Sequence, residues 1–205
     1  MVARDSAFPD LLARAAAPTL CLAFANTLMW RGSAEPSESL GDVDALLAWC
    51  ERAVYGDGAL AALRAWASTH PQDAAVFFTD AIALRETIYR VFELRAAGKP
   101  VADNDFAALS RAIAVAPARA QLARDDGHYG WRVAMPAPAA VLAPVLWSAA
   151  DLLLDPSRRI RQCANEKCLW LFVDESKSGT RRWCDMSACG NRAKAQRHYA
   201  RVKNA

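Results

Sequence analysis

Four cysteines near the end of the chain have a spacing that constrains how this segment can fold. Cys163, Cys168, Cys184 and Cys189 form the pattern C-x4-C-x15-C-x4-C. Two close pairs of thiols separated by the length of a hairpin are typical of a closed tetrahedral Zn²⁺ site, because one turn can place both sulfurs of a pair on one ion. We therefore predict one structural zinc ion per chain, held by these four residues.

Two other interpretations of the four cysteines stay open at this point: ordinary buried thiols, or two disulfides. The remaining cysteines, Cys21 and Cys50, stand alone in the segments LCLAF and LLAWCERAV and are typical of small core side chains. A zinc ion would also stabilise a tail of about fifty residues, which can hardly build a sufficient apolar core alone.

The chain lacks the signatures of catalysis. Coordination by four sulfurs leaves no open position for water or substrate, so zinc at this site would be structural. The sequence contains no Gly-rich phosphate loop, no G-x-S-x-G and no H-E-x-x-H motif, and His70, His128 and His198 lie in unrelated segments. We predict that the protein is not an enzyme.

The charge of the chain divides near residue 155. The net charge of the 205 residues is +3. From Pro156 onward there are 12 Lys and Arg residues against 4 Asp and Glu residues, a net charge of +8, which leaves −5 for the preceding part. Zn²⁺ with four thiolates carries a formal charge of about −2, which offsets only part of this surplus. The pattern predicts a body of residues 1–155 and a basic, metal-stabilised tail of residues 156–205 with a polyanion as its partner.

Hydrophobic periodicity predicts a mainly α fold for the body. The longest periodic segment, residues 74–97, should form the spine of the core. Asp42 is expected to cap a helix, and a β-hairpin is expected around residues 125–127. The other helices are expected at residues 20–30, 46–54, 60–67, 103–115 and 141–154.

Neither a membrane span nor a secretion signal is expected. The eighteen uncharged residues between Arg132 and Asp151 have the length of a short membrane helix, but three prolines interrupt them. We predict a loop followed by a buried helix. The N-terminal sequence MVARDSAFPDLL lacks the apolar run of a signal peptide, which favours a cytoplasmic protein with reduced thiols.

The tail is expected to fold as a small treble-clef-like finger with a knuckle, a hairpin and a helix. Residues 169–173 are typical of a short strand, whose expected partner is 181–184 across the turn DESKSGT. Asn191 is expected to cap the following helix. Lys194, Arg197 and Arg201 share one basic stripe of that helix.

Both parts of the chain resemble known families. The segment 158–201, RRIRQCANEKCLWLFVDESKSGTRRWCDMSACGNRAKAQRHYAR, closely resembles the CGNR zinc finger, named for the tetrapeptide found here at residues 189–192. The preceding part is similar to the helical ABATE domain at LCLAFANT (20–27), ALRETIYRVF (83–92) and SAADLLL (148–154). The resemblance implies a bacterial transcription regulator in which a helical regulatory domain precedes a finger that meets DNA.

The charge asymmetry and the resemblance together indicate that the finger contacts nucleic acid. A solvated helix face, or docking onto a protein such as a polymerase, are the alternatives. Two of the arginines, at 181 and 182, could instead neutralise the thiolates. The residues expected to contact phosphates are Arg181, Arg182, Arg192, Lys194, Arg197 and Arg201.

The body carries three polar residues that are candidates for an effector site. Asn26 and Thr27 interrupt an apolar segment, and Arg85 lies on the predicted spine. A regulator needs a sensing site, and polar groups within an apolar core can hold a small ligand. The alternative is internal satisfaction, with Thr27 bonded to a nearby carbonyl and Arg85 paired with a carboxylate. A small-molecule-binding protein or enzyme that uses the core of the body is the third class of function.

Overall fold

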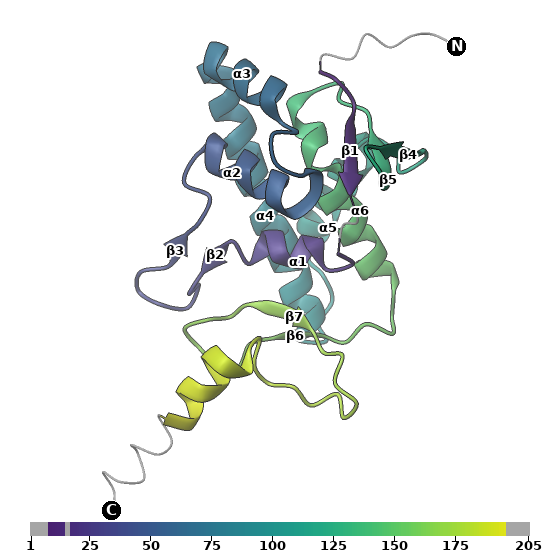
Figure 1. Cartoon of the computed structure of the whole chain (residues 1–205). Coiled ribbons are helices and arrows are strands. Elements are labelled where there is room, and N and C mark those ends of the chain that lie inside the picture. Colours follow the sequence, from purple (N-terminus) through teal and green to yellow (C-terminus); the bar gives the residue numbers. More distant parts are fainter. Residues whose placement is uncertain (1–7, 15–16, 196–205) are drawn as a thin grey trace, which may run out of the picture.

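The computed structural model describes residues 8–14 and 17–195, which fold into a mainly helical body and a C-terminal finger, as predicted (Figure 1). A π-helical turn, Glu51–Tyr55, extends the second helix, and a 3₁₀ turn, Pro138–Leu142, precedes the last helix of the body. The helices of the body are α1 (Leu20–Ala25), α2 (Val43–Cys50), α3 (Ala61–Thr69), α4 (Pro71–Ala96), α5 (Asp103–Val115) and α6 (Ala143–Leu154).

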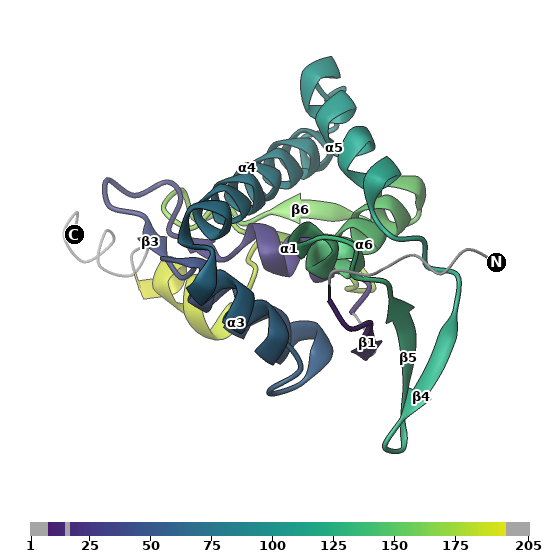
Figure 2. The same ribbon diagram turned by 90° about the horizontal axis from the view of Figure 1, so that it is seen from above.

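Helix α4 is the spine of the body, as its periodicity predicts. Its 26 residues begin at Pro71, in the first turn, where the missing N–H group costs nothing. The helix ends just before Gly98, whose φ of 66° only glycine adopts easily. Helices α1, α2, α3 and α5 pack against it, and so do the strands of the finger (Figure 2). Its buried apolar side chains include Ala74, Phe77, Ala81, Ile88, Val91 and Phe92.

Two other helices follow the sequence pattern closely. Helix α5 spans the predicted residues 103–115. Asp42 caps α2, since its side chain accepts a hydrogen bond of 2.7 Å from the N–H of Ala45. In α6, Pro144 lies in the first turn, so the prolines of the uncharged segment precede or begin helices without breaking them. Within the part of the chain that the structure describes, no helix has the length and apolarity needed to cross a membrane.

Helix α1 is shorter than predicted, because the chain leaves the helix at Asn26. The hydroxyl of Thr27 donates to the carbonyl of Phe24 at 2.7 Å, which competes with continued helical bonding. The next residues form strand β2 (Leu28–Met29), paired with strand β3 (Ser37–Glu38). The prediction of one helix over 20–30 was therefore wrong at its C-terminal half.

The predicted hairpin is present, and a strand that the sequence pattern missed extends it. Strands β4 (Leu122–Asp125) and β5 (His128–Val133) are antiparallel. Asp126 and Gly127 between them have φ of 40° and 75°, as a two-residue type I′ turn requires. Strand β1 (Leu11–Arg14) pairs with the other edge of β5. Four residues far from their partner in sequence carry too little periodicity to reveal such a strand.

The hairpin of the finger has a different partner strand from the one predicted. Strand β7 (Leu171–Val173) pairs with strand β6 (Ile160–Gln162), and the loop between them holds the first cysteine pair. Residues 181–184 are not a strand. They meet the loop after β6 through a main-chain hydrogen bond of 2.8 Å, from the N–H of Ala164 to the carbonyl of Arg182.

The finger is joined to the body by hydrogen bonds to its main chain and to the side chain of Gln162. The side-chain amide of Asn26 donates to the carbonyl of Leu171 at 2.8 Å, and its oxygen accepts from the N–H of Leu171 at 3.0 Å. The hydroxyl of Tyr89 on α4 donates to the carbonyl of Leu169 at 3.0 Å. The amide of Gln162 donates to the Tyr89 hydroxyl and to Glu93, each at 2.9 Å. We call these contacts the seam.

The seam also has an apolar part, because Ile160 and Leu171 of the finger belong to the same buried cluster as the core of the body. The chain therefore packs continuously across the predicted boundary. The division of the chain into two separate domains, residues 1–155 and 156–205, stays a prediction.

Replacement of Asn26 tests the seam. We expect Asn26→Ala to lower the free energy of unfolding by about 1–3 kcal/mol, because two main-chain groups of Leu171 lose their partners. Asn26→Asp should destabilise at least as much, since it places a carboxylate oxygen against the Leu171 carbonyl. Urea unfolding measures both. Asn104→Ala, on the exposed side of α5, is the control and should change stability by less than about 0.5 kcal/mol. Equal stability of Asn26→Ala and wild type would contradict the assignment.

Candidate metal centre and basic surface

The four cysteines predicted to bind zinc lie together in the finger. Their Sγ atoms are all within 4.8 Å of one another. The Sγ atoms of Cys168 and Cys184 are 3.7 Å apart, and those of Cys184 and Cys189 are 3.8 Å apart. Four sulfurs at about 2.3 Å from a zinc ion form a tetrahedron with edges of about 3.8 Å. The sulfurs therefore fit one structural zinc ion, and they are free thiols with no disulfide among them.

Large side chains enclose the cluster. Cys163, Cys168 and Cys189 are buried, and Cys184 is partly buried. Trp30, Trp170 and Trp183 pack around the sulfurs together with Phe172. Such an apolar shell limits the access of water and competing ligands to a bound metal.

A tight turn presents the first pair of sulfurs. The N–H groups of Cys168 and Leu169 both donate to the carbonyl of Asn165, at 2.8 and 3.2 Å. Leu169 has a φ of 58°, which reverses the chain into strand β7. The side-chain amide of Asn165 also donates to the Sγ of Cys189 at 3.5 Å, so this residue contacts both cysteine pairs.

A helical turn presents the second pair. Residues Met186–Gly190 form a π-helical turn that continues as α-helix over 191–195. Asp185 caps this helix, because its carboxylate accepts from the N–H of Ala188 at 2.8 Å. The prediction that Asn191 is the cap was wrong: the side chain of Asn191 donates to the carbonyl of Ser187, one turn earlier.

The thiols of the cluster share their protons unequally. Hydrogen bonds from Cys168 and Cys184, outweighing burial, lower the pKa of Cys163 to about 2. The same hydrogen bonds raise the pKa of Cys168 to about 12, and raise the pKa of Cys184 as well. A divalent cation at the centre replaces such shared protons when it binds to thiolates.

Asp174 organises the polar framework of the finger, and the sequence pattern did not identify it. Its buried carboxylate accepts from the N–H and hydroxyl of Ser176, at 3.0 and 2.5 Å. Its second oxygen accepts from Nε of Arg161 at 2.9 Å and from the N–H of Arg181 at 3.0 Å. These hydrogen bonds, that of the Ser176 hydroxyl foremost, lower the pKa of Asp174 to about 2. An Asp two residues before a Ser is a turn signal that could have pointed to it.

Arg181 braces the cluster from inside the finger. Its Nε donates to the carbonyl of Trp183 at 2.8 Å, and its Nη2 donates to the carbonyl of Cys184. Its guanidinium also lies 4.7 Å from the ring centroid of Phe172. These contacts match the alternative role of Arg181, a cation placed near the thiolates. They also occupy much of the Arg181 side chain, which was expected to contact phosphate.

The other residues expected to contact phosphate are more accessible. Arg182, Arg192 and Lys194 are exposed, and none forms an ion pair with another described residue. The guanidinium of Arg182 lies 5.4 Å from the ring centroid of Trp183. Arg197 and Arg201 lie outside the described residues.

The three residues predicted to bind an effector have partners within the protein. Arg85 is buried and donates from Nη1 to Glu38 at 2.7 Å and from Nε to Glu86 at 2.8 Å. Nη1 of Arg85 also lies 3.3 Å from the hydroxyl of Thr27. Asn26 faces Leu171 instead. These contacts agree with internal satisfaction, and an effector role for the three residues stays a prediction.

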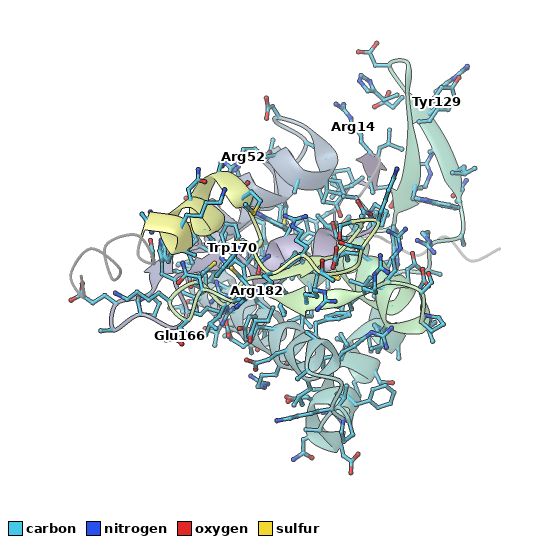
Figure 3. The ribbon with its side chains drawn as sticks, turned by 90° about the horizontal axis from the view of Figure 1, so that it is seen from below. Arg14, Arg52, Tyr129, Glu166, Trp170 and Arg182 are labelled. Atoms are coloured by element: carbon cyan, nitrogen blue, oxygen red, sulfur yellow. The ribbon has the colours of Figure 1, made fainter. Side chains whose placement is uncertain are left out.

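A loop of the body around Gly32 contacts the turn that holds the first cysteine pair, residues 163–168, which we call the knuckle. The N–H of Gly32 donates to the carbonyl of Lys167 at 3.2 Å. A Cβ atom at position 32 would lie 1.8 Å from the carbonyl oxygen of Glu166. The ring of Trp30 lies under the guanidinium of Arg192, 4.5 Å from its centroid to Cζ. Glu166, Trp170 and Arg182 belong to the same part of the molecule, around the cysteine loops (Figure 3).

Alanine at position 32 tests this contact. We expect Gly32→Ala to lower the free energy of unfolding by about 2–3 kcal/mol, because main chain must move to admit the methyl group. Gly41→Ala is a matched control, since nothing lies within 4 Å of its Cβ position. The control should change stability by less than about 1 kcal/mol, with a gain as the expected sign. Thermal unfolding of the two variants measures the difference, and equal values would show that the loop does not rest on the knuckle.

Comparison with family models agrees with this geometry. Residues 19–156 match the ABATE family, described as "Putative stress-induced transcription regulator", and residues 159–202 match the CGNR zinc finger. A search of curated proteins gave no match. The first match covers more than half of the chain, and the second contains all four clustered cysteines. The chain therefore belongs to the ABATE family and carries a C-terminal CGNR zinc finger.

Proposed function

We propose that the protein is a transcription regulator that binds DNA through its finger and senses a small effector through its helical body. The observation that carries the proposal is the set of exposed cations on a finger built around four clustered sulfurs, in a chain of a regulator family. The mechanism is binding, with no chemical step. Thiol ligands require a reducing compartment, and we place the protein in the cytoplasm.

Zinc is the metal that the donor set favours. Four cysteine sulfurs within 4.8 Å of one another suit Zn²⁺, which accepts thiolate ligands and is four-coordinate in structural sites. Cys163, Cys168, Cys184 and Cys189 would hold it, with Asn165 and the three tryptophans around them. The ion would fix the first cysteine loop to the start of the finger helix, and so fix the direction of Arg192 and Lys194 on that helix.

The metal proposal predicts one zinc ion per chain in protein purified without chelator. Cys168→Ser and Cys189→Ser should each lose the metal and lower the melting temperature, because a three-sulfur site binds zinc more weakly. Cys50→Ala removes a core thiol outside the cluster and should keep full zinc content. Elemental analysis gives the stoichiometry. The proposal would be contradicted by wild-type protein whose finger is folded without bound metal, or by a zinc content of Cys189→Ser equal to that of wild type.

DNA is the polyanion that the finger suits best. Arg182 and Arg192 each lie against a tryptophan ring, which holds the guanidinium in place and leaves N–H groups at its edge for phosphate oxygens. Lys194 follows Arg192 by two residues on the exposed helix. In the sequence, Arg197 and Arg201 follow Lys194 at helical spacing, and we propose that they extend this basic surface. Arg181 supports it from within the finger rather than by direct contact.

Salt dependence of DNA binding tests this role. Each phosphate contact that is lost should flatten the slope of log K against log salt by about one unit. We therefore expect a slope flatter by two to three units, about one for each contact removed, for Arg182→Ala, Arg192→Ala and Lys194→Ala combined. Arg124→Ala removes an equal charge from the hairpin β4–β5, far from the finger, and should leave the slope unchanged (Figure 1).

Two checks make the titration decisive. Zinc content and melting temperature of the triple variant show whether its finger is still folded. Absence of duplex binding by wild-type protein at low salt would move the finger to the second class of function, a zinc-stabilised module that docks onto a protein such as a polymerase.

A further inference from the structure

An apolar groove of about 690 Å³ lies between the first half of α4, the end of α5 and the segment 136–142. Its volume falls within the range of about 300–1,000 Å³ that is usual for small-molecule sites. Asn26, Thr27 and Arg85 do not line it. The groove is therefore separate from the residues that the sequence singled out for effector binding.

The floor and walls of the groove suit an apolar ligand. Phe77 and Leu146 form part of its buried floor, while Val76 and Val115 beside it are 61% and 83% exposed. Exposed side chains of this size next to a groove are what a bound apolar group would cover. Pro136, Pro138 and Pro117 also line it, and their fixed φ reduces the entropy lost on binding.

The described charged residues that line the groove all have the same sign. Asp73 and Asp80 line it, seven residues apart on α4, which places them two turns apart on one face. Both are exposed, and no ion pair joins either of them to another described residue. Among the residues that the structure describes, no Lys, Arg or His lines the groove. A ligand with a positive group would therefore meet two carboxylates for which no cation of the described part of the chain competes.

From the cavity and its charge, we propose that this groove binds a small amphipathic cation, with an aromatic or branched apolar body and one amine. The apolar body lies against Phe77 and Leu146, and the ammonium group lies at the rim beside Asp73 and Asp80. This inference rests on the sensing role proposed above, because it names the place and the chemical class of the effector.

A matched series of three probes tests the proposal on the full-length protein. The probes are 4-phenylbutylamine, 4-phenylbutanol and 4-phenylbutyrate, which share one apolar body and differ in charge. We expect the amine to bind about five to ten times more tightly than the alcohol, and the carboxylate to bind most weakly, since exposed charge pairs contribute modestly. The preference should shrink as salt rises. Amide chemical shifts locate the site, and their titration gives the affinities.

Three variants separate charge from shape. Asp73→Asn with Asp80→Asn should bring the amine to the affinity of the alcohol while the alcohol binds as before. Ala139→Trp, at an exposed position of the wall, should weaken all three probes. Asp125→Asn, on the hairpin, should leave the preference for the amine unchanged.

The outcomes keep the groove and the DNA-binding role distinguishable. Equal affinity for the three probes, shifts outside the groove, or no binding of any probe would overturn the groove proposal, whatever the finger does with DNA. The last result would leave the groove to a macromolecular partner. Amine binding that shifts residues of the groove and leaves DNA affinity unchanged would support the site and remove its role as a sensor.

Discussion

The seam between strand β7 and the body is the contact on which the arrangement of the molecule depends. Asn26 bonds both main-chain groups of Leu171, and Tyr89 bonds the carbonyl of Leu169 next to the knuckle. Partners of the main chain fix the position of a strand independently of its side chains. Ile160 and Leu171 then complete the core of the body. The cysteine cluster and the cations around it are therefore held at a defined place relative to α4.

The cations of the finger fall into two groups: some are bonded to other groups of the finger, and others have no carboxylate partner among the described residues. Asp174 binds Arg161 directly and holds the main chain of Arg181, whose side chain then reaches the carbonyls beside the cluster. Arg158 pairs with Glu175. Arg182, Arg192 and Lys194 have no such carboxylate partner among the described residues. A net charge of +8 in the tail thus overstates the charge that can face a polyanion, because several arginines are used to build the finger.

The sequence predicts those parts of the structure that local patterns determine. The periodicity of α4 and α5, the two-residue turn at Asp126 and Gly127, and the cysteine spacing are all local, and each corresponds to a feature of the fold. The end of α1, by contrast, combines the local bond from Thr27 to Phe24 with a distant one, because Asn26 meets Leu171, 145 residues away. The pairing of β7 with β6 accompanies the burial of Ile160 and Leu171 in the core of the body. Neither contact can be deduced from spacing, because both are chosen by tertiary packing.

The groove and the seam lie on the same helix, which bears on how a body of this kind can influence its finger. Asp80 at the groove and Tyr89 at the seam are nine residues apart on α4, about 14 Å along its axis. A ligand shifts a protein between two arrangements only if it binds one of them better. If an occupant of the groove favours one packing of α4, the change reaches Leu169 through the helix itself, without a flexible loop between them. Since Tyr89 and Asn26 hold the main chain of the finger, the cysteine cluster and the exposed cations around it would then move together.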